Sequence, residues 1–518
     1  MFRKAAKRRA DWRLLVGLVV FLAPGSLARA QGYCGDIGRA EAALTSTGVA
    51  VDFQSVEAFY DAAGGPCAWD QASAEALISA VDQAGDHGLD PALFHAGEFG
   101  EGAGASAEDA AAVRDLLLTD AAIKYGIALT RGLSADPVPS ADRAADARPN
   151  GELIDGLSKA LSQGGVEVWL QALSPRALPY DRLKAALSSY RAIAAAGGWS
   201  ALPGDMRIGR KKKSPLVTDL KRRLAIEGDL TFDDGSPVYD EAVRAAVLRF
   251  QERNGLRADG KLNAKTIERL NVSAAQRVAQ ISLNMERWRV YGRDLAVTRV
   301  EVNAPDATAV LFRDNAPVLK MNAVVGAPGH DTPTLMSTIN TVVLNPTWNI
   351  PRSIIQNEIK PLLKRNPNYL TENRMYWSGD QLIQEPGPQN ALGRIKFEFP
   401  NRYSVYLHDT PARRLFTDPE RAQSHGCVRL ERPLDLALEL LQGDPEWTRE
   451  AIEQAIREGD TKRIALSEPT AVVITYQTVF VGDDGMVQFR PDIYGLDTKL
   501  TLALSQRVAA MRSEPQQW

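Results

Sequence analysis

The spacing of apolar positions divides the chain into a helical part and a strand-rich part. From residue 36 to about 205, apolar residues recur three and four positions apart among good helix formers, as in Ala72–Ile78. This spacing predicts amphipathic helices. From residue 295, apolar and polar residues alternate in short runs between turns, as in Leu295–Val302 and Ile339–Leu344. We therefore expect a multi-domain α+β chain whose strands form a β-sandwich or barrel.

A smaller helical unit lies between these two parts, over residues 206–272. Three helical patterns follow one another there, separated by turns that contain glycine: Leu216–Leu224, Asp240–Gln251 and Asn263–Leu270. Asp240 is a good N-cap for the second helix. The basic run from Arg207 to Lys213 is interpreted as a solvated linker, with attraction to wall phosphates as the alternative.

The remaining boundaries complete the expected organisation. Residues 31–205 form a helical domain, and residues 273–294 form a connecting helix. The strand-rich domain covers residues 295–470, with a stretch of helix and loop at 351–386. Two apolar runs on either side of Asp483-Asp484-Gly485 predict a hairpin, so residues 471–518 are expected to form a C-terminal hairpin and helix.

The N-terminus has the pattern of a secretory signal peptide. A basic stretch precedes the apolar run Leu14–Ala23, and Ala28-Arg29-Ala30 is a small-x-small cleavage site, so residues 1–30 are expected to be removed after Ala30. An uncleaved membrane anchor is the alternative, although the apolar run is short for a span. Removal would change the net charge from −3 to −9, because this segment holds seven Lys/Arg and one Asp. A mildly acidic exported protein is not expected to bind nucleic acid.

The three cysteines differ in their expected state. In an oxidising compartment Cys34 and Cys67 are expected to form a disulfide, worth roughly 3–4 kcal/mol in the chain-entropy picture. Cys427 is then left unpaired, and nucleophilic catalysis is one reason for an exported protein to keep a free thiol.

Candidate chemistry is concentrated around Cys427. His425 lies two residues before it and His408 lies 19 residues before it. We prefer His408 as the general base, because it follows the strand-like run Tyr403–Leu407 and a strand-borne histidine makes a rigid partner for a cysteine on a turn. His425 is assigned a supporting, substrate-orienting role. Gly426 lets the backbone approach a substrate, and the N–H groups of Gly426 and Cys427 are the expected oxyanion donors.

Two other interpretations compete with catalysis. Cys427 could be a buried structural thiol, or Cys427, His425 and His408 could bind zinc. Neither a His-Glu-x-x-His run nor a Cys-x-x-Cys pair supports a zinc site, and there is no glycine-rich phosphate loop. We expect neither a metal nor a nucleotide cofactor. The lone histidines His87 and His95 are expected at the surface.

Several motifs together resemble the L,D-transpeptidases with a YkuD-type catalytic domain, in particular the large YcbB-like branch. The motifs that carry this resemblance are Asn345–Pro351, Pro386–Gly393, Lys396–Asn401, Tyr406–Pro411 and Ser424–Arg429. Residues 206–272 resemble a three-helix peptidoglycan-binding module, residues 31–205 resemble the scaffold region of the same branch, and residues 351–386 correspond to a short lid over the site.

The resemblance implies acyl transfer through a thioester on Cys427. The donor would be a peptidoglycan tetrapeptide stem that loses D-alanine, and the acceptor would be the side-chain amine of another stem, which gives a 3→3 cross-link. Carbapenem-type β-lactams would acylate the same cysteine, and residues 206–272 would bind glycan strands in the periplasm of a Gram-negative bacterium. The expected substrate contacts are Arg429, Ser424, Tyr406, Trp348 and Asn345.

Three other functions remain open on the sequence alone. Water could replace the acceptor amine, which would make the protein an L,D-carboxypeptidase or endopeptidase. A protein lysine could serve as the acceptor, which would attach an outer-membrane protein to the wall. The chain could also be a non-enzymatic wall-binding protein with a relict site, although the intact pair of Cys427 and His408 argues against this.

Overall fold

The computed structural model describes most of the chain, in six stretches: residues 37–65, 68–100, 109–134, 150–208, 212–291 and 295–513. The expected signal peptide at residues 1–30 and the expected Cys34–Cys67 disulfide lie outside these stretches. Among the described residues, no helix has the length and apolar character needed to cross a membrane.

The N-terminal helices surround one buried helix. The helices of this unit are α1 (Ile37–Thr47), α2 (Phe53–Ala63), α3 (Gln71–Asp82), α4 (Ala110–Arg131), α5 (Gly151–Gln163) and α6 (Val166–Leu173). Most of α4 is buried, because the other helices pack around it in a shared core. Asp52 and Asp70 cap α2 and α3 by accepting hydrogen bonds from backbone N–H groups three residues later.

The histidines of this unit are buried, so their expected surface location is wrong. His87, in the short 3-10 turn Ala84–His87, lies 2.9 Å from the Tyr180 hydroxyl through Nδ1. His95 lies between the Asp120 carboxylate at 2.6 Å and the Glu98 carboxylate at 3.0 Å. Each buried ring therefore has polar partners that replace water.

A second core joins segments that are far apart in sequence. Helix α7 (Leu178–Ala195) packs against α11 (Ala274–Tyr291) and the hairpin of β13 (Val479–Val481) and β14 (Val487–Phe489). The predicted domain at residues 31–205 and the predicted connecting helix are therefore not separate units. The sequence pattern showed that these helices are amphipathic, but it could not show that their apolar faces meet each other.

The predicted three-helix module is present. Its helices are α8 (Pro215–Ile226), α9 (Glu241–Arg253) and α10 (Ala264–Leu270), and Asp240 caps α9 by accepting from the Val243 N–H at 3.0 Å. Leu202 and Met206 belong to the same core, so the module begins earlier than the predicted boundary at residue 206.

The strand-rich domain has a closed pairing order. Its strands are β1 (Arg299–Asn303), β2 (Thr308–Arg313), β3 (Ala316–Gly326), β4 (Leu335–Leu344), β8 (Ile395–Glu398), β9 (Leu407–His408), β10 (Ala422–Ser424), β11 (Val428–Leu430) and β12 (Lys462–Thr475). The order is β10-β3-β11-β9-β8-β4-β12-β1-β2, and β2 also pairs with β3, which closes the ring. The predicted α+β class with a β-rich domain of barrel type is confirmed.

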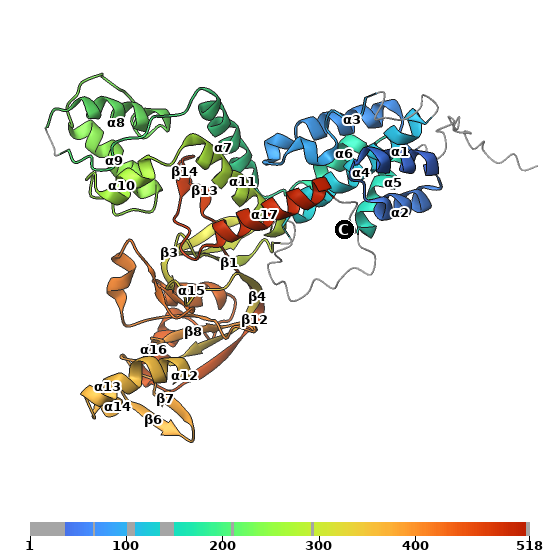
Figure 1. The fold of residues 1–518 in the computed structure, drawn as a ribbon. Helices are drawn as coiled ribbons and strands as arrows, with labels where there is room; N and C mark the ends of the chain where they lie inside the picture. The colour runs from blue at the N-terminus through green and yellow to red at the C-terminus, as the bar shows by residue number, and fades with distance from the viewer. Residues whose placement is uncertain are drawn as a thin grey trace, which may run out of the picture.

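The predicted boundary at residue 470 is wrong. Strand β12 continues to Thr475 and pairs with both β1 and β4, so it belongs to the barrel. Helix α17 (Leu496–Ser513) then leaves the barrel and reaches the N-terminal helices (Figure 1), where Leu504, Val508 and Met511 pack on their core. Figure 1 also shows the module and the N-terminal helices on opposite sides of α7 and α11.

The insertion at residues 351–386 forms a small unit at the end of the barrel (Figure 1). Its elements are α12 (Arg352–Ile354), a π-helical turn (Ile355–Ile359), α13 (Lys360–Arg365), α14 (Tyr369–Glu372), β6 (Met375–Ser378) and β7 (Gln381–Gln384), with β5 (Trp348–Asn349) beside β7. A separate apolar core, which includes Ile354, Ile359 and Leu382, holds this lid unit together. The other elements of the barrel domain are the 3-10 turn Arg413–Thr417, α15 (Pro433–Leu440) and α16 (Arg449–Glu458).

Candidate active site

A sharp turn between β10 and β11 presents Cys427. Gly426 has a φ of +106°, a conformation that side chains disfavour, and an added Cβ would lie 3.4 Å from the Asp331 carbonyl oxygen. The Thr332 hydroxyl donates to the Gly426 carbonyl at 2.9 Å and accepts from the Gly326 N–H at 2.8 Å. The turn is thus fixed to the connection between β3 and β4.

Ser424 holds the turn and does not face a substrate. Its buried hydroxyl donates to the Cys427 carbonyl at 2.5 Å and accepts from the Gly426 N–H at 3.1 Å. The predictions of a substrate contact for Ser424 and of an oxyanion donor at the Gly426 N–H are therefore wrong, because both groups are already bonded. The Cys427 N–H has no acceptor among the described residues, so it remains available as a donor.

Strand register brings the motif residues onto one face. Strands β9 and β11 pair in parallel, with Val428 opposite Leu407 and Arg429 opposite His408. Side chains alternate along a strand, so Leu407 and Val428 enter the barrel core. The other face of this pair of strands and of the residues next to them carries Tyr406, His408, Cys427 and Arg429. The predicted strand at Tyr403–Leu407 is wrong, because β9 begins at Leu407 and Ser404 has a φ of +56°.

His408 is a buried, neutral imidazole. Its Nδ1 donates to the Asp409 carbonyl at 2.5 Å, and the Leu392 carbonyl also bonds the ring. Burial, and then the charge of Arg429, lower the pKa of His408 to about 3. The structure therefore places His408 on the same face as the thiol and orients its ring through backbone carbonyls. Its role as general base stays a prediction.

The Cys427 thiol is half-buried and unpaired. Its sulfur lies 4.0 Å from the Ser404 carbonyl oxygen and shares a hydrogen bond with the Tyr406 hydroxyl. Burial raises the pKa of Cys427, while the bonds from Tyr406 and the charges of Lys396 and Arg429 act in the opposite direction. The raised pKa favours the protonated thiol at neutral pH.

The two predicted aromatic wall residues lie together beside the thiol. The Trp348 indole N–H donates to the Tyr406 oxygen, and the Tyr406 ring lies 5.5 Å from the His408 ring. The Lys396 ammonium lies 4.2 Å above the Tyr406 ring. A cavity of about 550 Å³ is lined by Lys396, Ser404 and Tyr406, among others, so a ligand in it would reach the residues that contact the sulfur.

Arg429 fits the predicted role of a carboxylate contact. It is half-buried on the face that carries Cys427, and its Nε atom is buried without a partner among the described residues. Burial lowers its pKa, while the charges of Cys427 and Glu358 raise it. A guanidinium on this face could bond a carboxylate through its other nitrogens, and the role of Arg429 stays a prediction.

Asn345 does not contact a substrate, so that prediction is wrong. The residue is fully buried, and its amide donates to the Ala455 carbonyl at 2.9 Å and the Asp460 carbonyl at 3.2 Å. Its side-chain oxygen accepts from Arg394 at 3.2 Å. Asn345 therefore joins the end of β4 to the end of α16, which explains why an asparagine is suited to this position.

His425 faces the lid unit. Its Nε2 forms an ion pair with Glu358 Oε1 at 2.6 Å, and its ring lies 4.9 Å from the His330 ring. Both partners of the ion pair are more than one-third exposed. His425 therefore connects the catalytic turn to the π-helical turn of the lid unit, and its supporting role stays a prediction.

Glu358, Lys396 and Thr332 were not predicted as site residues. Glu358 and Thr332 come from segments that carry no titratable motif, so only their long-range contacts reveal them. Two motifs named in the sequence analysis, Pro386–Gly393 and Lys396–Asn401, each contain an asparagine in a turn, which is a sequence signal for a fixed loop. The Asn401 amide closes the loop that carries Ser404, and the Asn390 amide holds the loop that carries Leu392.

Family comparisons agree with this geometry. The model of the YkuD family, described as an L,D-transpeptidase catalytic domain, matches residues 297–447. This chain contains an L,D-transpeptidase catalytic domain. The L,D-transpeptidase domain is preceded by a match to a scaffold domain at residues 54–187 and a match to a provisional peptidoglycan binding domain at residues 213–270.

A curated protein is also similar to part of this chain. A protein of Haemophilus influenzae, which carries a provisional name as an L,D-transpeptidase, is 30% identical over 244 residues. The match covers 43% of this chain and 49% of the relative, so it spans about half the length of that protein.

Solved structures also match parts of the chain, at low sequence identity and low TM-score. An L,D-transpeptidase from Stackebrandtia nassauensis is 14% identical, with 53% of this chain and 97% of that chain covered and a TM-score of 0.22. The catalytic domain of an Enterococcus faecium L,D-transpeptidase acylated by ertapenem is 14% identical, with 35% and 100% covered and a TM-score of 0.19.

Proposed function

We propose that the protein is a cysteine-dependent L,D-transpeptidase that forms 3→3 cross-links between peptidoglycan stems. The observation that carries this proposal is the single face that presents Cys427, His408, Tyr406 and Arg429, within a domain that matches the L,D-transpeptidase catalytic family. The match to a peptidoglycan binding domain supports the choice of substrate.

The first half-reaction acylates Cys427. The sulfur attacks the carbonyl carbon of the third residue of a tetrapeptide stem as the thiol proton passes to His408. The tetrahedral oxyanion accepts a hydrogen bond from the Cys427 N–H. When the carbon–nitrogen bond breaks, His408 returns the proton to the leaving D-alanine amine, and a thioester remains.

The second half-reaction transfers the acyl group. The side-chain amine of a second stem attacks the thioester carbonyl, His408 accepts a proton from that amine, and the carbon–sulfur bond breaks. The proton returns to the sulfur, which regenerates the thiol. Arg429 would hold a carboxylate of the stem, and the lid unit would exclude water from the thioester.

The accessory proposals follow from the same assignment. The protein would act in the periplasm after cleavage behind Ala30, and carbapenem-type β-lactams would acylate Cys427. Hydrolysis by water and transfer to a protein lysine use the same thioester, so the products distinguish these alternatives from cross-linking.

The test is intact mass spectrometry of the protein incubated with a purified disaccharide-tetrapeptide, with separation of the products. We expect a transient acyl adduct on the protein and a dimer joined 3→3. If tripeptide formed without any dimer, the products would indicate carboxypeptidase activity and not cross-linking.

Two variants complete this experiment. Cys427→Ala should give neither adduct nor product while keeping its thermal unfolding temperature, because the half-buried thiol can be shortened with little loss of packing. Cys427→Ala that still forms the dimer would contradict the assignment of the nucleophile.

A further inference from the structure

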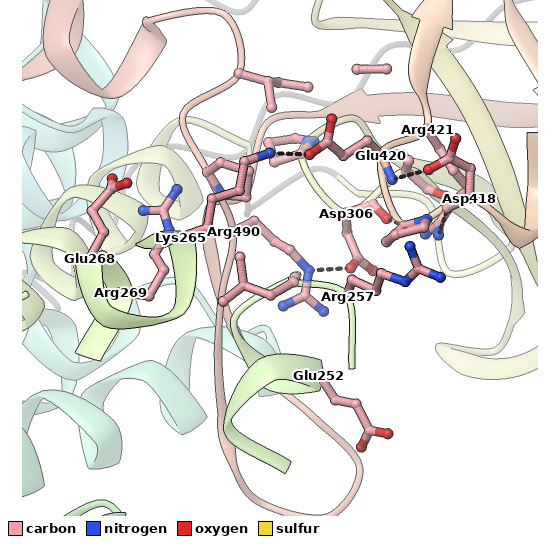
Figure 2. Close-up of a pocket in the computed structure, with 18 of the residues that line it drawn as sticks. Glu252, Arg257, Lys265, Glu268, Arg269, Asp306, Asp418, Glu420, Arg421 and Arg490 are labelled. Carbon is pink, nitrogen blue, oxygen red and sulfur yellow. Dashed lines mark hydrogen bonds and ion pairs between the residues drawn. The ribbon is translucent and has the colours of Figure 1, made fainter. Parts of the chain in front are cut away.

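A cleft separates the three-helix module from the barrel, away from the catalytic turn. Figure 2 shows its lining, which comes from the module, from the β1–β2 connection, from the segment before β10 and from the segment after β14. The cleft has a volume of about 930 Å³, within the range of ligand pockets, roughly 300–1,000 Å³.

Contacts between the domains fix the walls of this cleft. Arg490 donates to the Asp306 carboxylate at 2.5 Å and to the Arg253 carbonyl at 2.9 Å, which joins the barrel to α9. Lys265 on α10 forms an ion pair with Glu420 (Figure 2). Arg421 donates to the Asp306 carbonyl at 2.9 Å. The space between module and barrel is therefore a built cleft, held by side chains from both domains.

The outer part of the cleft is positively charged. A neighbouring cavity of about 600 Å³ shares Arg257, Asp418 and Arg421 with it and adds Arg414. Asp418 is the single acidic residue that lines this outer cavity, beside three arginines, although the whole chain carries a net charge of −3. Asp418 accepts hydrogen bonds from Gln423 and from the Glu420 N–H, and its charge acts on Arg421.

Two of the three arginines are available for a ligand. Arg421 is held by backbone carbonyls, whereas Arg257 and Arg414 are exposed and have no side-chain partner among the described residues. Figure 2 shows the Arg257 guanidinium with no dashed contact. Arg257 comes from the module and Arg414 from the barrel, so an anion between them would contact both domains. The acidic residues Glu252 and Glu268 lie on the module side of the inner cleft.

The outer cavity is lined by one residue of β10, Gln423. The next residue is Ser424, whose hydroxyl holds the turn that carries Cys427. The three arginines of the outer cavity suit a ligand with carboxylates, because a guanidinium bonds a carboxylate in a two-pronged way.

We propose that Arg257 and Arg414 bind the carboxylates of a peptidoglycan stem, and that the cleft between the module and the barrel holds this stem while Cys427 acts on another. The assignment rests on the proposed function for the identity of the ligand. Its chemistry, an anionic peptide bound across two domains, is given by the cleft itself.

The test measures binding of the full-length chain to purified peptidoglycan sacculi by co-sedimentation. All proteins carry Cys427→Ala, so the result does not depend on catalysis. Arg257→Gln and Arg414→Gln should each weaken binding about threefold to tenfold, and the double variant more. Arg222→Gln is the matched control, because Arg222 is an exposed module arginine on α8 that lies outside both cavities and should leave binding unchanged.

A second arm requires no variant. The protein that keeps both arginines is tested on sacculi whose carboxyl groups have been amidated. Its binding to these sacculi should be as weak as the binding of the double variant to native sacculi. Binding that survives in the double variant, or that is insensitive to amidation, would overturn the proposal. If Arg222→Gln lost as much binding to native sacculi as Arg257→Gln or Arg414→Gln, the proposal would also be overturned. Such a result would show a non-specific effect of charge.

The two proposals can fail independently. If the protein forms no 3→3 dimer but its sacculus binding depends on Arg257, Arg414 and stem carboxylates, the cleft assignment stands and the proposed reaction falls. If dimers form and the double variant binds like the parent, the reaction stands and the cleft assignment falls.

Discussion

The two sides of the catalytic turn are held in different ways. On the barrel side, strand pairing and buried hydrogen bonds to Gly426 and Ser424 fix the position of Cys427. On the lid side, the recorded side-chain link to the turn is the exposed ion pair between Glu358 and His425. Strand pairing and buried hydrogen bonds thus hold Cys427 from the barrel side, while the contact from the lid unit to the turn is exposed.

The largest effect is expected on the barrel side, at His408. His408→Gln keeps a polar side chain but removes the proton acceptor, so dimer formation should fall about 10²-fold to 10⁴-fold. The rate of product formation under single-turnover conditions measures it, with Lys320→Gln, an exposed position on β3 outside the cavity beside the thiol, as a control. Loss of less than tenfold would assign the base to another residue.

The second effect concerns the protonation of the thiol. Burial raises the pKa of Cys427 and lowers that of His408 to about 3, so the resting pair is a neutral thiol and a neutral imidazole. The alkylation rate of Cys427 by iodoacetamide should rise about tenfold per pH unit from pH 6 to pH 8, because only the thiolate reacts. A rate that is constant across this range would indicate a preformed thiolate–imidazolium pair.

The same burial of His408 makes stability depend on pH. Its pKa is about 3 in the folded state and about 6.5 when unfolded, so between these values the unfolded state binds more protons. Stability should therefore fall as the pH is lowered from 6.5, by up to about 1.4 kcal/mol per pH unit for this group. Chemical denaturation at pH 6.5 and pH 5 gives the unfolding free energy of the parent and of His408→Gln. The parent should lose more of it on acidification, and an equal loss in both proteins would contradict this prediction.

A smaller loss is expected from Thr332→Val. This change keeps the shape of the side chain but leaves the Gly426 carbonyl and the Gly326 N–H without their shared partner. Unfolding free energy should drop by about 1–3 kcal/mol, because both groups are buried. Urea denaturation followed by circular dichroism measures it, and Thr334→Val, at the edge of the same connection, is the control.

The smallest effect is expected on the lid side, from Glu358→Gln. An exposed ion pair contributes about 0.2–1 kcal/mol, so stability should change little. The KM for the stem should change by about twofold to fivefold, while the rate of acylation by a carbapenem at saturation stays the same. An effect on dimer formation as large as that of His408→Gln would place Glu358 among the reacting groups and would remove the contrast between the two sides.

Local patterns predicted what depends on local spacing. The helices of the module, the N-cap at Asp240 and the strand character of β1 to β4 follow from residues near one another in sequence. Cys427 and His408 stood out because few residue types can perform acyl transfer, and the strand register brings them to one face.

Predictions failed where a residue is bound by distant backbone. Asn345 was interpreted as a substrate contact, but its partners Ala455 and Asp460 lie more than one hundred residues later. Ser424 is a residue type common in active sites, yet its hydroxyl donates to the Cys427 carbonyl within the same turn. The break at residue 470 falls within β12, where the pattern changes from alternating to almost fully buried because the second half lies between β4 and β1.

Helix α17 has a consequence for the order of folding. Met511 belongs to the core built mainly from α1 to α6, and Arg512 pairs with Asp90 at 2.6 Å. The first helices to be synthesised therefore lack a part of their core until a segment made about four hundred residues later arrives. Helix α17 therefore couples the stability of the N-terminal helices to that of the barrel domain from which it leaves.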